Sequence, residues 1–199
     1  MLPRFTQTYQ KQKGFIRGWE GRSGSGKGLD LQVPGFGRAL KQGLREHYQA
    51  RVSLLGFGAR IDNPKTFVEL DPSGAKDRYG LPLAKIHSSF SDNDLAIFKD
   101  IVEKYTYILE QAGAEHLTAS RAPAQPGTSE HEVGTCRMTR DPREGVCDGF
   151  GRAHEVANLF VADAAPFVSN PDKNPTLTIC ALAWRTSDYI AELMRKGEI

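Results

Sequence analysis

The sequence has little of what marks a membrane, exported or nucleic-acid-binding protein. No run of about 18 apolar residues occurs, so we expect no membrane span. Residues 1–15 lack the apolar core of a signal peptide, which leaves the localisation open. The net charge is only +2 and the Lys and Arg residues are scattered among acids, so no nucleic-acid partner is expected.

Cysteine is also scarce. Cys136, Cys147 and Cys180 form an odd set without C-x-x-C spacing, which gives neither a disulfide framework nor a paired zinc motif. A reduced interior is the simplest interpretation. The remaining composition, 39% hydrophobic and 25% charged, is typical of a globular protein, and 199 residues suffice for one domain or two small ones.

Hydrophobic periodicity predicts a mixed α/β chain. Residues 91–113 carry the strongest helix signal, with cap-type residues at Ser91 to Asn93 and a natural stop at Gly113. A D-N-P turn between residues 51–61 and 65–70 predicts that these two strands pair antiparallel. The pattern predicts further strands at 14–20, 83–90 and 158–162, and further helices at 35–50 and from 174 onward.

A Pro- and Gly-rich stretch at residues 121–129 predicts a linker. We therefore expect a domain boundary there. Residues 1–127 would form an antiparallel sheet flanked by helices, and residues 128–199 would form a second unit with one strand and the last helix.

The stretch G-R-S-G-S-G-K-G at residues 21–28 nearly matches a phosphate-binding loop, with Gly21, Gly26 and Lys27 correctly spaced. That motif requires a Ser or Thr hydroxyl after the lysine and a following helix. Gly28 occupies the hydroxyl position, and the next residues alternate like a strand before reaching Pro34. We expect a mobile loop rather than a nucleoside triphosphate site.

Residues 129–138 read S-E-H-E-V-G-T-C-R-M and place a histidine beside two carboxylates. A helical zinc site of the H-E-x-x-H type requires a second histidine at position 135, where Thr135 stands. His131, Cys136 and His154 provide no tight ligand pair, so no metal site is expected. His131 is left as a buried structural histidine or as a proton acceptor.

The last helix has a clear start. Asn174 is expected at its N-cap and Pro175 at its first position, and the exposed N–H groups of such a terminus suit a negatively charged group. A well-capped terminal helix without a ligand is the alternative. Asp163 follows the strand-like residues 158–162, and ligands of α/β folds gather at strand ends and helix N-termini, so Asp163, Ala164 and Asn174 are candidates for one ligand site.

Three stretches, taken in order, resemble the C-terminal signature of the glucose-methanol-choline (GMC) family of flavin-dependent oxidoreductases. They are H-E-V-G-T-C-R-M, the stretch from D-P-R-E-G-V-C-D-G-F-G to N-L-F-V-A-D-A-A-P-F, and N-P-T-L-T-I-C-A-L-A-W-R-T-S-D-Y-I. The resemblance covers residues 128–194 in register, and residues 70–94 are similar to the family's substrate-domain sheet and helix.

The resemblance implies an FAD enzyme that oxidises an alcohol, sugar or polyol by hydride transfer to flavin N5. His131 matches the family's active-site histidine and would act as general base, and Asn174 matches the second active-site position and would orient the alcohol oxygen. Asp163 and Ala164 match the strand end beside the ribityl and diphosphate chain of FAD. Pro175 and Thr176 match the backbone beside the pyrimidine edge of the flavin.

The sequence departs from the family in lacking the G-x-G-x-x-G fingerprint that binds the ADP half of FAD. We therefore expect the C-terminal portion of such an enzyme: a substrate-binding domain at 1–127 and, at 128–199, the returning segment of the FAD-binding domain. The last helix and the 158–162 strand would then have apolar faces with few partners in this chain. The alternatives are an incomplete remnant, a subunit that needs a separate FAD-binding chain or an electron-acceptor partner, and an unrelated α+β binding domain.

Overall fold

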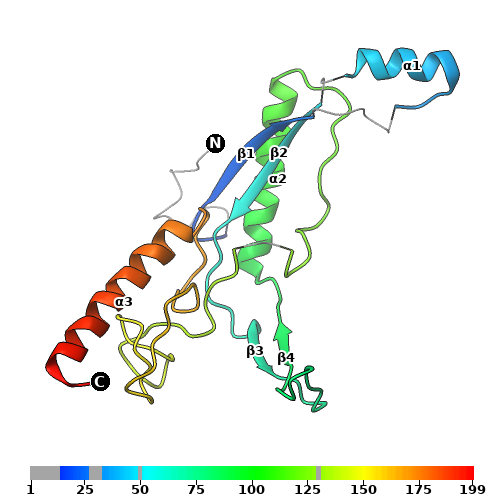
Figure 1. The fold of residues 1–199 in the computed structure, drawn as a ribbon. Helices are drawn as coiled ribbons and strands as arrows, with labels where there is room; N and C mark the ends of the chain where they lie inside the picture. The colour runs from blue at the N-terminus through cyan, green and yellow to red at the C-terminus, as the bar shows by residue number, and fades with distance from the viewer. Residues whose placement is uncertain (1–13, 27–32, 49–50, 129–130) are drawn as a thin grey trace.

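The computed structural model describes residues 14–26, 33–48, 51–128 and 131–199. In these ranges three helices and two antiparallel two-stranded sheets follow one another along the chain (Figure 1). The mixed α/β class predicted from the sequence is confirmed. The elements are β1 (Trp19–Ser25), α1 (Gly37–Glu46), β2 (Val52–Gly58), β3 (Phe67–Leu70), β4 (Ala84–His87), α2 (Asp92–Gln111) and α3 (Thr176–Lys196).

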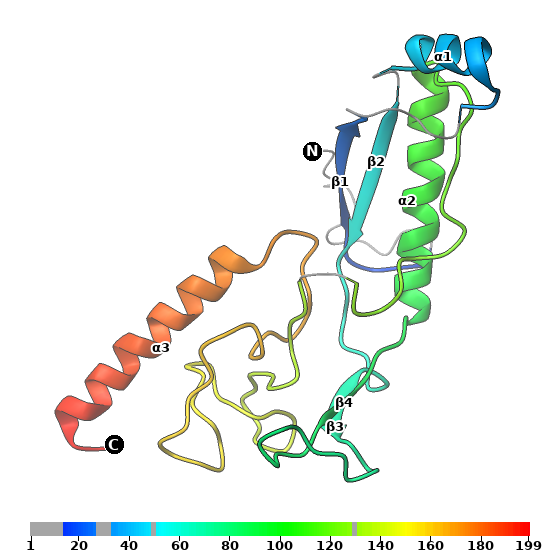
Figure 2. The ribbon, with the colours of Figure 1, turned by 45° about the vertical axis from the view of Figure 1, so that its right-hand side comes forward.

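Helix α2 lies along one face of the β1–β2 sheet (Figures 1 and 2). The register pairs Trp19 with Gly58 and Gly21 with Gly56. Directly opposed residues share a face of a sheet, and alternate residues along a strand do so too. These four residues therefore form the face that α2 covers.

The glycines of this face allow α2 to approach closely. A Cβ atom on Gly56 would lie 2.4 Å from Ile101 Cγ2, and one on Gly58 would lie 2.6 Å from Ile97 Cγ2. Both distances are far below van der Waals contact, so no larger residue fits without a shift of the helix. The core between helix and sheet is a single small cluster of Phe15, Trp19, Ile97, Ile101 and Tyr105.

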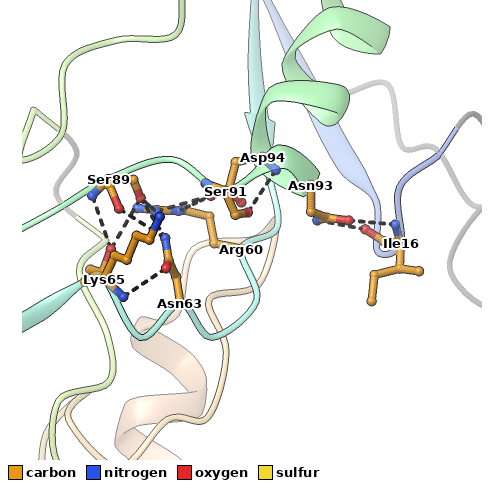
Figure 3. Close-up of polar contacts among 9 residues, drawn as sticks. Ile16, Arg60, Asn63, Lys65, Ser89, Ser91, Asn93 and Asp94 are labelled. Atoms are coloured by element: carbon orange, nitrogen blue, oxygen red, sulfur yellow. Dashed lines mark hydrogen bonds and ion pairs between the residues drawn. The ribbon is translucent and has the colours of Figure 1, made fainter.

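Polar contacts fix the start of α2 (Figure 3). Ser91 Oγ accepts a hydrogen bond from the Asp94 amide, and the Asp94 carboxylate accepts one from the Ser91 amide at 2.9 Å, which forms the capping box. Arg60 pairs with Asp94 at 3.3 Å. Asn93 Oδ1 accepts from the Ile16 amide at 2.9 Å. The helix start and its cap, predicted at Ser91 to Asn93, are confirmed.

The predicted pairing of strands 51–61 and 65–70 is wrong. β2 pairs with β1, whereas β3 pairs with β4 from Phe67 opposite His87 to Leu70 opposite Ala84. The chain leaves the first sheet at Arg60, whose backbone exchanges two hydrogen bonds of 2.9 Å with Asn170. The segment at Asn170, which is distant in sequence, therefore pairs with the chain after β2, where the predicted hairpin would have paired it with residues 65–70.

The predicted loop at 21–28 is wrong in its first part. Residues 21–25 belong to β1, because β2 supplies a hydrogen-bonding partner along all of them. Residues 27–28 lie outside the described ranges. The strand predicted at 14–20 begins only at Trp19, after Arg17, whose φ of 72° is incompatible with a strand.

The strand predicted at 158–162 is also not formed. A single bridge between Arg152 and Phe160 is its only pairing among the described residues. A strand needs a hydrogen-bonding partner along its length, and no neighbouring strand of the described ranges provides one there.

The helix predicted at 35–50 is confirmed as α1, but it buries none of its residues. Helix α3 runs away from the β1–β2 sheet, with its first turn nearest to it (Figure 2). Leu177, Trp184 and Met194 of α3 are mostly exposed, as expected for an apolar face with few partners in this chain. Across the described ranges, no helix combines the length and the apolar character that a bilayer crossing requires.

We predict that Gly56→Ala destabilises the fold by about 1–3 kcal/mol, because the added methyl group must displace Ile101 and hence α2. The measurement is the free energy of unfolding in urea. Gly149→Ala is the control, since nothing lies within 4 Å of a Cβ there, and it should change stability by less than about 0.5 kcal/mol. Equal effects of the two substitutions would show that α2 does not depend on the glycine.

Candidate active site

The H-E-V-G-T segment is held against residues 164–166 by backbone hydrogen bonds. The Gly134 amide donates to Ala164 O at 3.0 Å, and the Cys136 amide donates to Ala165 O at 3.1 Å. Gly134 and Thr135 both have positive φ, at 93° and 77°. This conformation suits glycine but is rare for a β-branched residue. The structure therefore brings the predicted motif and the predicted Asp163–Ala164 corner together.

His131 is half-buried. Its carbonyl oxygen accepts a hydrogen bond of 2.7 Å from Asn170 Nδ2. Its imidazole lies near the ring of Phe57, with 6.4 Å between ring centroids. Asn170 is itself tied to Arg60 at the end of β2, so one asparagine links the histidine segment to the sheet.

Asn174 is not the N-cap of α3, and this prediction is wrong. The helix begins at Thr176 with Pro175 as its N-cap, whose carbonyl accepts from the Ile179 amide at 2.9 Å. The side chain of Asn174 cannot cap the helix because its Oδ1 accepts a hydrogen bond from the Arg22 guanidinium on β1.

Arg22 connects the two predicted catalytic residues. Its guanidinium carbon lies 4.8 Å from the centroid of the Phe57 ring, the same ring that His131 approaches. Phe57 stands opposite Glu20 in the register, so Glu20, Arg22 and Phe57 share the face of the sheet that α2 does not cover. His131 therefore contacts this face at the Phe57 ring, and Asn174 contacts the same face at the Arg22 guanidinium.

Glu20 is the buried charge of this face, with only 1% of its surface exposed. It pairs with Arg22 at 3.0 Å and with Lys173 at 3.4 Å. Burial alone would lower the pKa of the Lys173 ammonium, but hydrogen bonds and charge attraction from Asp172 and Glu20 outweigh burial and raise it. Lys173 therefore stays charged. Because it directly precedes Asn174, its ion pair with Glu20 holds this part of the chain against the sheet.

Sequence reasoning missed Glu20, Arg22 and Phe57. The available signal was the alternation in W-E-G-R at residues 19–22, which puts Glu20 and Arg22 on one side of a strand. Nothing in that alternation says which distant segment covers this side.

The residues predicted to contact the cofactor lie at two places. Asp163 is exposed, and its Oδ1 accepts from the Ala165 amide at 2.7 Å, while Ala164 uses its carbonyl to hold Gly134. Pro175 is buried and Thr176 is exposed at the first turn of α3. This turn has no side-chain cap and no acidic residue, so its N–H groups and positive dipole end are available to a negatively charged group.

The cysteines show no reactive arrangement. Cys147 is fully buried, and its Sγ donates to Cys136 O at 3.1 Å. Burial raises the pKa of the Cys147 thiol, which disfavours the thiolate. His154 Nε2 lies 3.4 Å from Thr139 Oγ1. Within the described ranges no group of three His, Cys, Asp or Glu side chains is placed to hold a metal ion.

The structure has a surface pocket of about 450 Å³, but none of the predicted site residues lines it. Its walls carry mixed charge, with Arg137 paired to Asp62 across it. The pocket is therefore not assigned to the site around Phe57. Its lining residues are Asp62, Arg137, Thr139, Arg143, Glu144 and Val168.

Residues 62–183 match the model of a protein family described as GMC oxidoreductase. The chain is similar to 2-methyl-1,2-propanediol dehydrogenase of Mycolicibacterium austroafricanum, with 31% identity over 80% of this chain and 28% of that protein. Gluconate 2-dehydrogenase flavoprotein of Pantoea cypripedii is 26% identical over 92% of this chain and 32% of that protein.

The fructose dehydrogenase large subunit of Gluconobacter japonicus is 36% identical over 35% of this chain and 13% of that protein. The chain thus spans about a third or less of the length of each of these relatives.

We predict that Asn170→Ala loosens the histidine segment, because it removes the donor to His131 O. Amide hydrogen exchange at Gly134 should become faster, with a stability loss of about 1 kcal/mol. Asn93→Ala is the matched control, since it also removes a side-chain NH2 group that donates to a backbone carbonyl, in this case that of Ile16. Exchange at Gly134 that is equally fast in both variants, or unchanged in Asn170→Ala, would contradict this role.

Proposed function

The chain belongs to the GMC oxidoreductase family, and we propose that it forms part of an FAD-dependent oxidoreductase that acts on the CH–OH group of an alcohol, sugar or polyol. The names of its relatives support this substrate class, since they specify a diol, a sugar acid and a sugar. In the same proposal residues 1–127 form the substrate-binding domain, and residues 128–199 are the returning segment of the FAD-binding domain.

His131 is proposed as the general base. An imidazole is neutral in a large fraction of molecules near pH 7 and takes a proton readily. Removal of the hydroxyl proton makes the carbinol carbon a better hydride donor. The observation that carries the proposal is that His131 and Asn174, which lie far apart in the sequence, meet the same Phe57–Arg22 pair.

Asn174 is proposed to bind the substrate oxygen. A carboxamide does not take up a proton at neutral pH, but its NH2 group donates hydrogen bonds. Such a donor stabilises the negative charge that develops on the oxygen as the proton leaves. The two residues therefore have different roles, one holding the proton and the other orienting the alcohol.

In this proposal two parts of the chain would hold FAD. The uncapped first turn of α3, which follows Pro175 and begins at Thr176, would offer its N–H groups and the positive end of a helix dipole to an anionic ring edge. Asp163 and Ala164 form the second proposed contact, beside the ribityl and diphosphate chain. When bound, FAD supplies the acceptor for the hydride that leaves the substrate carbon.

A second candidate is that the chain acts with a separate FAD-binding chain or an electron-acceptor partner. The observation that favours it is the apolar face of α3, on which Leu177 is 83% and Trp184 73% exposed. One relative is named as a large subunit. Under this candidate the proton-handling residues are unchanged and only the source of the flavin differs.

We predict that His131→Ala lowers kcat/KM of the FAD-loaded protein by about 10²- to 10⁴-fold, because the hydroxyl proton loses its acceptor. Turnover of the alcohol or sugar with an artificial electron acceptor measures the loss. His47→Ala, at the exposed end of α1, is the control and should retain turnover. Undiminished turnover in His131→Ala with flavin still bound would remove the proposed base.

The two candidates differ in flavin binding by this chain alone. If the chain needs a separate FAD-binding chain, we expect the purified chain to show no flavin absorbance near 450 nm after incubation with FAD and desalting, as the sequence lacks the G-x-G-x-x-G fingerprint. Retained, stoichiometric absorbance would instead favour a chain that binds FAD by itself. Turnover is not needed for this measurement, so the result is independent of the substrate.

A further inference from the structure

The contact between Arg22 and Asn174 determines which end of the Asn174 amide is available to a substrate. Arg22 Nη2 reaches the Oδ1 atom of Asn174. A guanidinium carries only donors, so the atom that faces it must be the amide oxygen and cannot be the NH2 group. The amide has nearly the same shape at both ends, so the donor-only character of the guanidinium determines which end faces it.

We propose that Arg22 is a positioning residue, which holds the amide oxygen of Asn174 so that the NH2 group is presented to the substrate oxygen. This inference rests on the proposed function of Asn174. If the amide were turned round, its carbonyl oxygen would meet an oxygen that is becoming negative, and the contact would be repulsive. Arg22 prevents that orientation.

Arg22 can do this because it is itself held on three sides. Its Nε and Nη2 atoms donate to Glu20 Oε1 at 3.3 and 3.0 Å, and Glu20 is almost completely buried. Its guanidinium stacks on Phe57 at 4.8 Å. Its backbone is paired with Leu55 inside the sheet. The donor to Asn174 is thus fixed before any substrate binds.

The orientation also separates the roles of the two proposed catalytic residues. Arg22 holds the amide oxygen of Asn174, so the NH2 group, which carries only donors, is the end presented to the substrate oxygen. A carboxamide does not take up a proton at neutral pH, so Asn174 does not accept the hydroxyl proton. The proton must go to another group, and His131, whose ring lies 6.4 Å from that of Phe57, is the proposed acceptor.

The first test is kinetic and uses the FAD-loaded protein. Arg22→Met should lower kcat about tenfold to hundredfold with KM little changed, because the amide is no longer held in the productive orientation. Arg22→Lys should recover part of the loss, since an ammonium still donates to the amide oxygen. Arg38→Met on α1, which buries none of its residues, is the control and should not change kcat.

Two further variants separate orientation from simple attachment. Asn174→Asp would keep an oxygen acceptor for Arg22 and would strengthen this contact by adding a negative charge. It would also replace the NH2 donor with an oxygen, so we expect turnover to fall at least as far as in Asn174→Ala. The double variant Arg22→Met with Asn174→Ala should be no slower than Asn174→Ala alone, because Arg22 acts through Asn174. An active Asn174→Asp variant, or effects that multiply, would overturn the proposal.

The second test needs no turnover. In the ¹⁵N-labelled chain the side-chain NH2 signals of Asn174, identified by their loss in Asn174→Asp, should shift in Arg22→Met and stay in place in Arg38→Met. Unshifted signals in Arg22→Met would overturn the proposal, and Arg22→Leu, which also lacks a donor, serves the same comparison if the methionine variant does not fold. This result does not depend on His131. The proposed role of Arg22 can therefore fail while the proposed function stands, and the proposed function can fail while the Arg22 contact is confirmed.

Discussion

The carboxylate of Glu20 is buried in strand β1, and the arrangement of the site depends on the two cations that neutralise it. A buried carboxylate is costly unless it is paired. Here Arg22 comes from the same strand and Lys173 from the segment before α3. Because Lys173 pairs with this buried carboxylate, the C-terminal segment is tied to the sheet at the residue next to Asn174.

The two faces of the β1–β2 sheet have different roles, one in the stability of the fold and the other in its proposed chemistry. One face carries Gly21, Gly56 and Gly58, which let α2 pack closely and form the small core. The opposite face carries Glu20, Arg22 and Phe57, which are contacted by the motif segments around His131 and Asn174. Strand alternation produces both faces from one pair of strands, so residues that stabilise the helix contact and residues that hold the site are neighbours in sequence.

Sequence reasoning succeeded where the determinants are local. The helix at 91–113 was predicted because its cap at Ser91 and its periodicity are contained in one short stretch. It failed where a distant partner decides: β2 pairs with β1 rather than with residues 65–70, and Arg22 rather than the helix takes the side chain of Asn174. The site residues His131 and Asn174 came from the family resemblance and stay predictions as catalytic groups. Alternation places Glu20 and Arg22 on one side of a strand, but no pattern around them or around Phe57 identifies the segment that covers this side.

The most direct measurement is a crystal structure of the FAD-loaded protein with a non-reactive analogue of the alcohol. We expect the analogue's oxygen to lie within about 2.6–3.2 Å of both a ring nitrogen of His131 and the NH2 group of Asn174, with Arg22 still on the amide oxygen. An analogue oxygen bound away from His131, or an Asn174 amide turned with its oxygen toward the analogue, would contradict it.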